Sequence, residues 1–189
     1  VEVLEKLDED SRAEIMQKLP FKKRIQLKRS LSYPEYSCGR NMSVDFLSVP
    51  YWWTIARVKK YIKDSKKAVE NEEAIIFITD QEQKLIGSIS VIKLLNENSV
   101  ETIASCYDSN VISVKVFDSI PNISHLFDQH DLDIIPVTNK NGNIVGVLEL
   151  AEIIEYLQKS SDKQALRRAG VFEAKNNTLF GVTYTRCLL

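Results

Sequence analysis

The apolar positions of the first 30 residues recur every three or four places, with charged residues between them, as in LEKLDEDSRAEIMQKL. This spacing predicts amphipathic helices, and Pro20 divides the segment into two of them. Asp8 and Ser11 are candidate N-caps, and Ser11 with Glu14 has the spacing of a capping box. We therefore expect two short helices at the start of the chain.

From residue 31 the pattern changes to short apolar runs separated by turns, and the new pattern occurs twice. The connector SYPEYSCGRNM precedes it, with Pro34 and Gly39 as helix breakers. The first copy predicts strands at 46–49, 74–79 and 84–90, a helix capped by Thr54 and a helix from 91. The second predicts strands at 111–114, 133–138 and 143–150, a helix after Ser119 and a helix from 151.

The spacing between matched positions supports a true repeat. Thr54 and Ser119 are 65 positions apart, whereas Gly87 and Gly146 are 59 apart, so the first copy holds six extra residues. These fall in the charged stretch KDSKKAVENEE, where a surface loop tolerates an insertion. The strands are apolar throughout, which is typical of small sheets covered on both faces. We expect an α+β fold in which the two copies pack together, because one copy alone buries too little surface.

Composition narrows the class of protein. With 189 residues, 27% of them charged, and a net charge of -1, the chain suits one or two globular domains and carries no overall field for nucleic acid. Cys38, Cys106 and Cys187 form no CxxC pair, which argues against a zinc site or a disulfide scaffold. No nucleophile with a base and no P-loop is present, so an enzyme is not expected. Both ends read as cut from a longer chain, since it starts at Val1 and stops at Leu189 without a polar tail.

The repeated unit resembles the tandem cystathionine-β-synthase-type (CBS) domain pair, a regulatory module. The flanks sharpen the resemblance, because LSYPEYSCGRNMSVDFLSVP is similar to the hinge of MgtE-type magnesium transporters. The segment ALRRAGV (165–171) likewise resembles that family's junction into the helix leading to the membrane pore. The resemblance implies four parts: the end of a helical domain with the hinge (1–40), CBS domain 1 (41–100), CBS domain 2 (101–160), and a linker with the start of the pore helix (161–189).

By this resemblance the chain is the cytosolic, magnesium-sensing part of a homodimeric magnesium transporter. Mg²⁺ would bridge acidic residues of the helical and CBS domains and favour a compact, closed dimer. The implied partners are a second copy, joined through the CBS domains, and the transmembrane pore domain of the same chain. The implied location is the cytoplasmic side of the cell membrane, as the soluble part of a multi-pass protein, with no nucleic-acid partner.

The resemblance also implies a set of metal-binding residues: Asp10 and Glu14 on the first helix, Asp131 before a strand of the second copy, and Glu152 and Glu155 on its last helix. Magnesium prefers carboxylate oxygens and keeps several waters, so a few carboxylates from each side suffice. The alternative interpretation is that these acids are ordinary solvated helix positions, which also suit a helix N-terminus.

Many CBS pairs bind adenine nucleotides through a Ser or Thr followed by Asp three residues later. Here Ser90 is followed by Lys93, and the second copy has Glu149 and Glu152 instead. Neither copy keeps the pair, which disfavours nucleotide binding, although a nucleotide-binding CBS module of another effector stays the alternative function. Other departures from the family pattern are Tyr36, Lys159 and Lys163, where the family commonly has acids or continues an acidic run. These departures leave three alternatives: fewer bound ions than in typical members, a response over a different range of magnesium, or a diverged member whose gating has lost its dependence on magnesium.

Overall fold

The computed structural model describes residues 8–65 and 74–158. The chain divides into two compact units, unit 1 (1–154) and unit 2 (155–189). Of the second unit only residues 155–158 are described, and they are helical. The expected linker and pore helix at 161–189, with the ALRRAGV junction, lie outside the described residues.

Two helices open the described part, α2 (Glu9–Lys18) and α3 (Phe21–Leu31), which confirms the two helices expected there. The N-cap of α2 is Asp8, whose carboxylate accepts a hydrogen bond from the Ser11 amide at 3.2 Å. Ser11 thus lies inside the first turn, and the expected capping box between Ser11 and Glu14 is wrong. Asp8 prevails because its carboxylate reaches an amide that has no partner within the helix.

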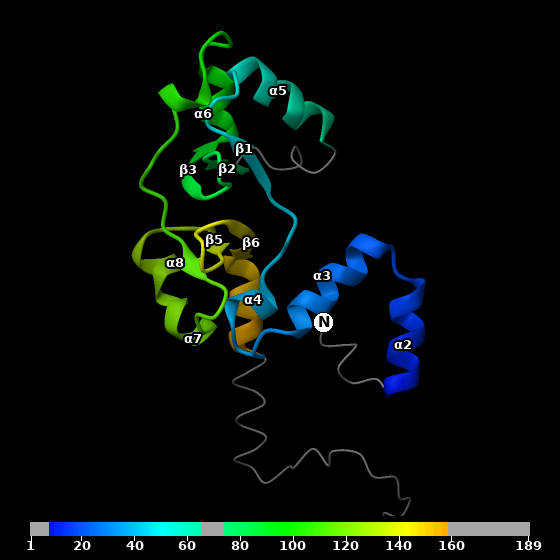
Figure 1. The fold of residues 1–189 in the computed structure, drawn as a ribbon. Helices are drawn as coiled ribbons and strands as arrows, with labels where there is room; N and C mark the ends of the chain where they lie inside the picture. Colours follow the sequence, from blue (N-terminus) through cyan, green and yellow to red (C-terminus); the bar gives the residue numbers. More distant parts are fainter. Residues whose placement is uncertain (1–7, 66–73, 159–189) are drawn as a thin grey trace, which may run out of the picture. The chain divides into compact units, whose positions relative to one another are not determined.

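The two copies of the repeat form two separate three-stranded sheets with the same topology (Figure 1). In each sheet the first strand runs parallel to the middle strand, and the third is antiparallel to it. The first sheet contains β1 (Leu47–Pro50), β2 (Ile75–Thr79) and β3 (Leu85–Ser90). The second contains β4 (Val114–Lys115), β5 (Ile134–Thr138) and β6 (Ile144–Glu149). The expected α+β fold, with two copies of one small-sheet unit, is therefore confirmed.

The helices of the repeat also lie where the pattern predicts them. The first copy has α5 (Ile55–Asp64) and α6 (Val91–Asn96). The second has α7 (Ile120–Ile123), α8 (His125–Gln129) and a helix at 150–158. The strand expected at 111–114 is the exception, because only its last residue is in β4.

Each sheet carries one buried threonine at the end of its middle strand. The Thr79 hydroxyl donates to the Val49 carbonyl oxygen at 3.5 Å, and the Thr138 hydroxyl donates to that of Val114 at 3.2 Å. Both hydroxyls bind the first strand of their own sheet, so the matched threonines have a structural role in both copies. A buried hydroxyl without such a partner would cost free energy.

The chain segment that precedes each repeat pairs with the other repeat. Ser43, ahead of the first copy, exchanges two backbone hydrogen bonds with Val147 of β6, at 2.8 and 2.9 Å. Asp108, ahead of the second copy, exchanges two with Ser88 of β3, at 2.8 and 2.9 Å. The third strand of each sheet is thus bridged at one residue by the segment that introduces the other repeat, and the two repeats are linked reciprocally.

This crossing explains the two matched glycines. A Cβ atom added at Gly146 would lie 2.6 Å from the Met42 sulfur and 2.7 Å from the Ser43 carbonyl oxygen. A Cβ atom added at Gly87 would overlap the Tyr107 ring and the Asp108 carbonyl oxygen. Both strands therefore need glycine where another segment passes close to their backbone.

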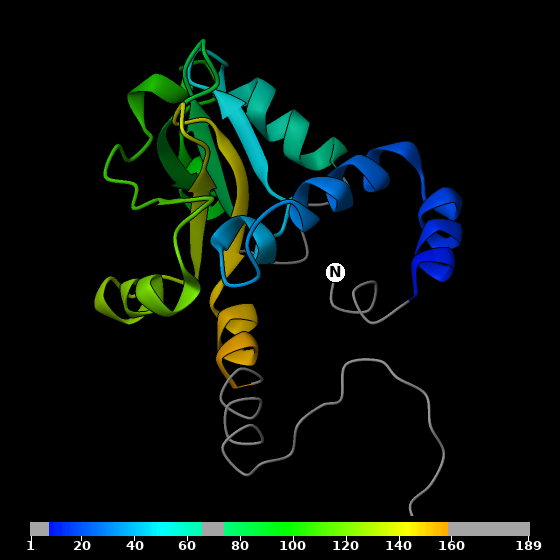
Figure 2. The same cartoon turned by 60° about the horizontal axis from the view of Figure 1, so that its bottom comes forward.

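The hinge helix α4 (Cys38–Asn41) packs on β4 and β6 of the second repeat (Figure 2). The amides of Cys38 and Gly39 donate to the carbonyl oxygens of Asp118 and Val116, both at 2.8 Å. One terminal nitrogen of Arg40, which is 8% exposed, donates to the Ser30 carbonyl oxygen at 3.1 Å. The hinge thus ties the end of α3 to the second sheet.

Candidate functional site

The acidic pair expected on the first helix lies on α2. Asp10 and Glu14 are four residues apart and so share one face of the helix. The Glu14 carboxylate accepts a hydrogen bond from the Lys18 ammonium at 2.6 Å, and both side chains are largely exposed. Glu14 is thus already paired with a cation, which a metal ion would have to displace.

Asp131 lies in the exposed turn between α8 and β5, with a backbone φ of +51°. Asp and Asn tolerate this left-handed conformation better than most residues. The backbone alone therefore gives a reason for aspartate here, and this reason is independent of any metal.

Glu152 and Glu155 are exposed residues of the helix at 150–158, and the second of them belongs to the second unit. Within 8–65 and 74–158, the structure brings no three His, Cys, Asp or Glu residues close enough to hold a metal ion. Among these described residues the five acidic positions therefore do not form a ready metal site, and their assignment to magnesium stays a prediction.

The hydroxyl position of the nucleotide signature is used as a helix cap. Ser90 is the N-cap of α6, and its hydroxyl oxygen accepts a hydrogen bond from the Lys93 amide at 3.2 Å. At the matched end of β6, Glu149 is exposed. The first copy thus keeps its serine for a local structural reason, as N-cap preferences would predict.

Two cysteines lie in the interior of unit 1. Burial, reinforced by the nearby Asp118 carboxylate, raises the pKa of the Cys38 thiol to about 12. Burial also raises the pKa of the Cys106 thiol. Since the thiolate is the reactive form, neither cysteine is a nucleophile at neutral pH.

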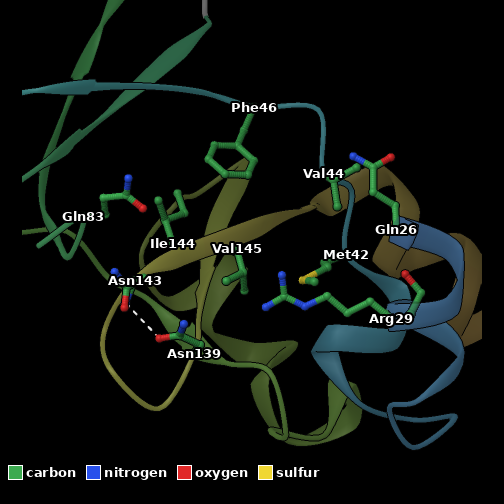
Figure 3. A pocket seen from close by; sticks show the side chains of 11 residues that line it. Gln26, Arg29, Met42, Val44, Phe46, Gln83, Asn139, Asn143, Ile144 and Val145 are labelled. Atoms are coloured by element: carbon green, nitrogen blue, oxygen red, sulfur yellow. Dashed lines mark hydrogen bonds between the residues drawn. The ribbon is translucent and has the colours of Figure 1, made fainter. Parts of the chain in front are cut away.

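A pocket that the sequence analysis missed lies between α3, the segment 42–46 and the two hairpin turns, which join β2 to β3 and β5 to β6 (Figure 3). Its volume is about 570 Å³, and we call it the α3 pocket. It is lined by Gln26, Arg29, Ser30, Met42, Val44, Phe46, Gln83, Asn139, Asn143, Ile144 and Val145. Two sequence patterns could have identified part of the lining. The residues from α3 are spaced by three and four positions, as on one face of a helix, and the segment 42–46 contributes every second residue. Only the tertiary structure brings the two sets together.

Comparison with known proteins places this geometry in a family context. Residues 102–159 match the CBS domain family. The chain is 26% identical over 156 residues to the magnesium transporter MgtE of Enterococcus faecalis. This alignment covers 82% of this chain and 34% of the relative. It is 24% identical over 135 residues to MgtE of Bacillus subtilis, covering 70% of this chain and 29% of the relative. The chain thus spans about a third of the length of these relatives.

Solved structures show the same fold. The soluble part of a magnesium transporter superposes with a TM-score of 0.76 at 24% identity, covering 84% of this chain and 61% of that one. The cytosolic domain of the Mg²⁺ channel MgtE, in a complex with ATP, gives 0.67 at 19% identity, covering 82% and 68%. Among the described residues, no helix is both long enough and apolar enough to cross a membrane.

Proposed function

We propose that this chain, which contains a CBS domain and is homologous to MgtE magnesium transporters, is the cytosolic regulatory region of a magnesium transporter. One observation carries this proposal. The alignment with the Enterococcus relative spans 156 residues, which is longer than the two repeats together, so it includes flanking sequence. In the whole protein its partner is the transmembrane pore domain, at the cytoplasmic face of the membrane. Its role is regulation and not catalysis.

The proposed signal is cytosolic Mg²⁺, bound between carboxylates of the helical segment and the CBS pair. Asp10 and Glu14 supply one side, and Asp131, Glu152 and Glu155 supply the other. Facing carboxylates repel one another unless a cation neutralises them. Bound Mg²⁺ therefore favours a compact, closed dimer, and its loss favours separation of the parts.

The Glu14–Lys18 ion pair supports a weak, reversible response. An exposed pair of this kind contributes little stability, so Mg²⁺ can displace the ammonium group. Replacing Lys18 by Gln should then tighten magnesium binding at α2, whereas Glu14→Gln should weaken it. Opposite effects of two neighbouring substitutions separate a metal site from a general effect on the helix.

The test is small-angle scattering and calorimetric titration of the chain with Mg²⁺, at constant ionic strength. We expect a smaller radius of gyration with Mg²⁺, an apparent affinity that rises in Lys18→Gln, and a response that shrinks in Glu14→Gln and Glu155→Lys. Glu82→Gln, an exposed acid outside the proposed set, is the matched control. An unchanged radius in the wild type would remove the sensing proposal, and a wild-type response in Glu155→Lys would remove that residue from the site.

Exposed apolar side chains support a homodimer through the CBS domains. Ile92 and Leu95 are one turn apart on α6 and are 49% and 59% exposed, and Tyr61 of the neighbouring α5 is 39% exposed. Burying such a face against a second copy removes apolar area from water. We expect a dimer in analytical ultracentrifugation and a monomer for Ile92→Glu with Leu95→Glu. The control is Val100→Glu, which changes a residue that is 84% exposed and lies outside α6.

A nucleotide-binding regulatory module is the second candidate. The observation in its favour is that one structural relative was solved in a complex with ATP. A ligand that binds only the native state raises the melting temperature. We expect no such shift with ATP at millimolar concentration, because Lys93 stands where the signature requires aspartate. A saturable shift would favour this second function.

A further inference from the structure

We propose that the α3 pocket binds a small organic anion with a compact apolar body, and that Arg29 holds its anionic group. This site is separate from the acidic residues proposed for magnesium and does not depend on them. Its volume of about 570 Å³ lies within the range of small-molecule sites.

The charge of the lining indicates the sign of the ligand. Arg29 is the one charged residue among those that line the pocket. Its Nε donates to the Tyr33 hydroxyl oxygen at 3.3 Å, and this bond orients the guanidinium. Both terminal nitrogens are left to donate to a ligand. Among the residues that the structure describes, no carboxylate pairs with it. A guanidinium in this state is a ready bidentate donor to a carboxylate or phosphate.

The opposite wall carries side-chain amides (Figure 3). The side-chain oxygen of Asn139 accepts hydrogen bonds from the backbone amides of Asn141 and Asn143, at 2.9 and 3.0 Å. Its NH₂ group is therefore left to donate. The Asn143 NH₂ donates to the Glu82 carbonyl oxygen at 2.6 Å, which leaves its own side-chain oxygen to accept. This wall suits a second polar group on the ligand.

The floor of the pocket is apolar. Met42, Val44 and Phe46 line it from alternate positions of one extended segment, and Ile144 and Val145 line it from β6. Except for Met42, these side chains are only half-buried. A ligand that covered them would gain free energy from removing apolar area from water. The pocket thus combines an apolar floor with one guanidinium group. A bare inorganic anion would contact the guanidinium but would leave the apolar floor exposed to water.

The position of the pocket gives the ligand a regulatory role. Arg29 comes from the helical segment, Val44 from the chain that leads into the first repeat, and Asn143 from the turn of the second repeat. That turn also contacts the first hairpin, where the Leu85 amide donates to the Gly142 carbonyl oxygen at 3.0 Å. An occupied pocket would hold α3 against both repeats, as a ligand that bridges two elements favours their joined state.

The test compares two probes of nearly equal shape, naphthoate and naphthamide, by NMR titration of the ¹⁵N-labelled chain. We expect naphthoate to shift the side-chain amide signals of Asn139 and Asn143, and naphthamide to bind at least tenfold more weakly, the usual effect of losing a charged hydrogen bond. Arg29→Gln should remove this difference between the probes, and Arg29→Lys should restore it in part. Tyr33→Phe should weaken naphthoate alone, because it frees the guanidinium to rotate.

The matched control is Lys28→Gln, which removes an exposed positive charge from the adjacent position of α3 outside the pocket lining. It should bind naphthoate as the wild type does. Equal affinities for the two probes, wild-type binding by Arg29→Gln, or shifts confined to other surfaces would each overturn the proposal. Glu14→Gln should leave naphthoate binding unchanged, so failure of the magnesium proposal is distinguishable from failure of this one.

Discussion

Ser43 and Val147 exchange two backbone hydrogen bonds, of 2.8 and 2.9 Å, which join the chain ahead of the first repeat to the last strand of the second. Ser88 and Asp108 make the reciprocal pair. The third strand of a small sheet would otherwise present unpaired amides and carbonyls at its edge. Because the segment ahead of each repeat bonds to the edge strand of the other, we expect the two repeats to fold and unfold together.

The crossing at Gly87 makes this position sensitive to a single methyl group. Gly87→Ala should destabilise unit 1 by about 1–3 kcal/mol, as overpacking in a filled interior does, because a Cβ would overlap the Tyr107 ring. Urea unfolding followed by circular dichroism measures this. Gly142→Asn is the control, since asparagine tolerates the positive φ of +83° there and only exposed Lys84 side-chain atoms are near. Equal midpoints for Gly87→Ala and the wild type would contradict the close approach.

Arg40 should hold α3 against the hinge. Arg40→Met keeps much of the apolar stem but removes the donor to the Ser30 carbonyl oxygen. We expect the free energy of unfolding to fall by about 1–3 kcal/mol, which is typical when a hydrogen bond from a charged group is removed. We also expect faster amide exchange at the C-terminal end of α3. Hydrogen exchange read by mass spectrometry tests this, with Arg57→Met on α5 as the control. Unchanged protection of α3 would show that another contact anchors the helix.

Asp131 allows its backbone role to be separated from its charge. Asp131→Asn keeps a residue that tolerates the left-handed φ and removes the carboxylate, so stability should change little. Asp131→Ala should cost about 1 kcal/mol through backbone strain. Under the magnesium proposal both variants should weaken the metal response equally. Thermal unfolding and magnesium titration of both variants measure the two effects, and full metal response in Asp131→Asn would assign the residue to the turn alone.

The N-cap role of Ser90 is testable without any ligand. Ser90→Ala removes the acceptor for the Lys93 amide and should destabilise unit 1 by about 1 kcal/mol. Ser90→Asp should retain most of that stability, because aspartate is also a good N-cap. Chemical unfolding of both variants measures the difference. If the alanine and aspartate variants unfold at the same midpoint, the cap contributes nothing.

Burial of Cys38 predicts a dependence of stability on alkaline pH. The pKa of this thiol is about 12 in the folded chain, against 9.0 for an unburied thiol. The unfolded chain therefore loses this proton first as pH rises. The thiol's contribution to stability is complete below about pH 9 and is lost progressively toward about pH 12. Unfolding across this range should show a steeper loss for the wild type than for Cys38→Ala, and parallel curves would contradict the raised pKa.

Much of the architecture was readable in the sequence because it is local. The spacing of apolar residues predicts α2 and α3, and the offsets of 59 and 65 positions predict a repeat whose β2, β3, β5 and β6 lie as expected. Hydrogen bonds within a helix or hairpin join nearby residues, so side-chain periodicity reports on them directly. The matched pair Gly87 and Gly146 was also visible, although its reason was not.

The tertiary structure decided what joins distant segments. No side-chain pattern marks that Ser43 pairs with Val147 and not with its own sheet, because backbone hydrogen bonds are the same for every residue type. The same holds for the α3 pocket, whose Arg29 and Asn143 come from elements that periodicity treats separately. The sequence by itself determined the elements, their order and their duplication. Which edges meet, and therefore which polar groups share a pocket, depended on long-range packing.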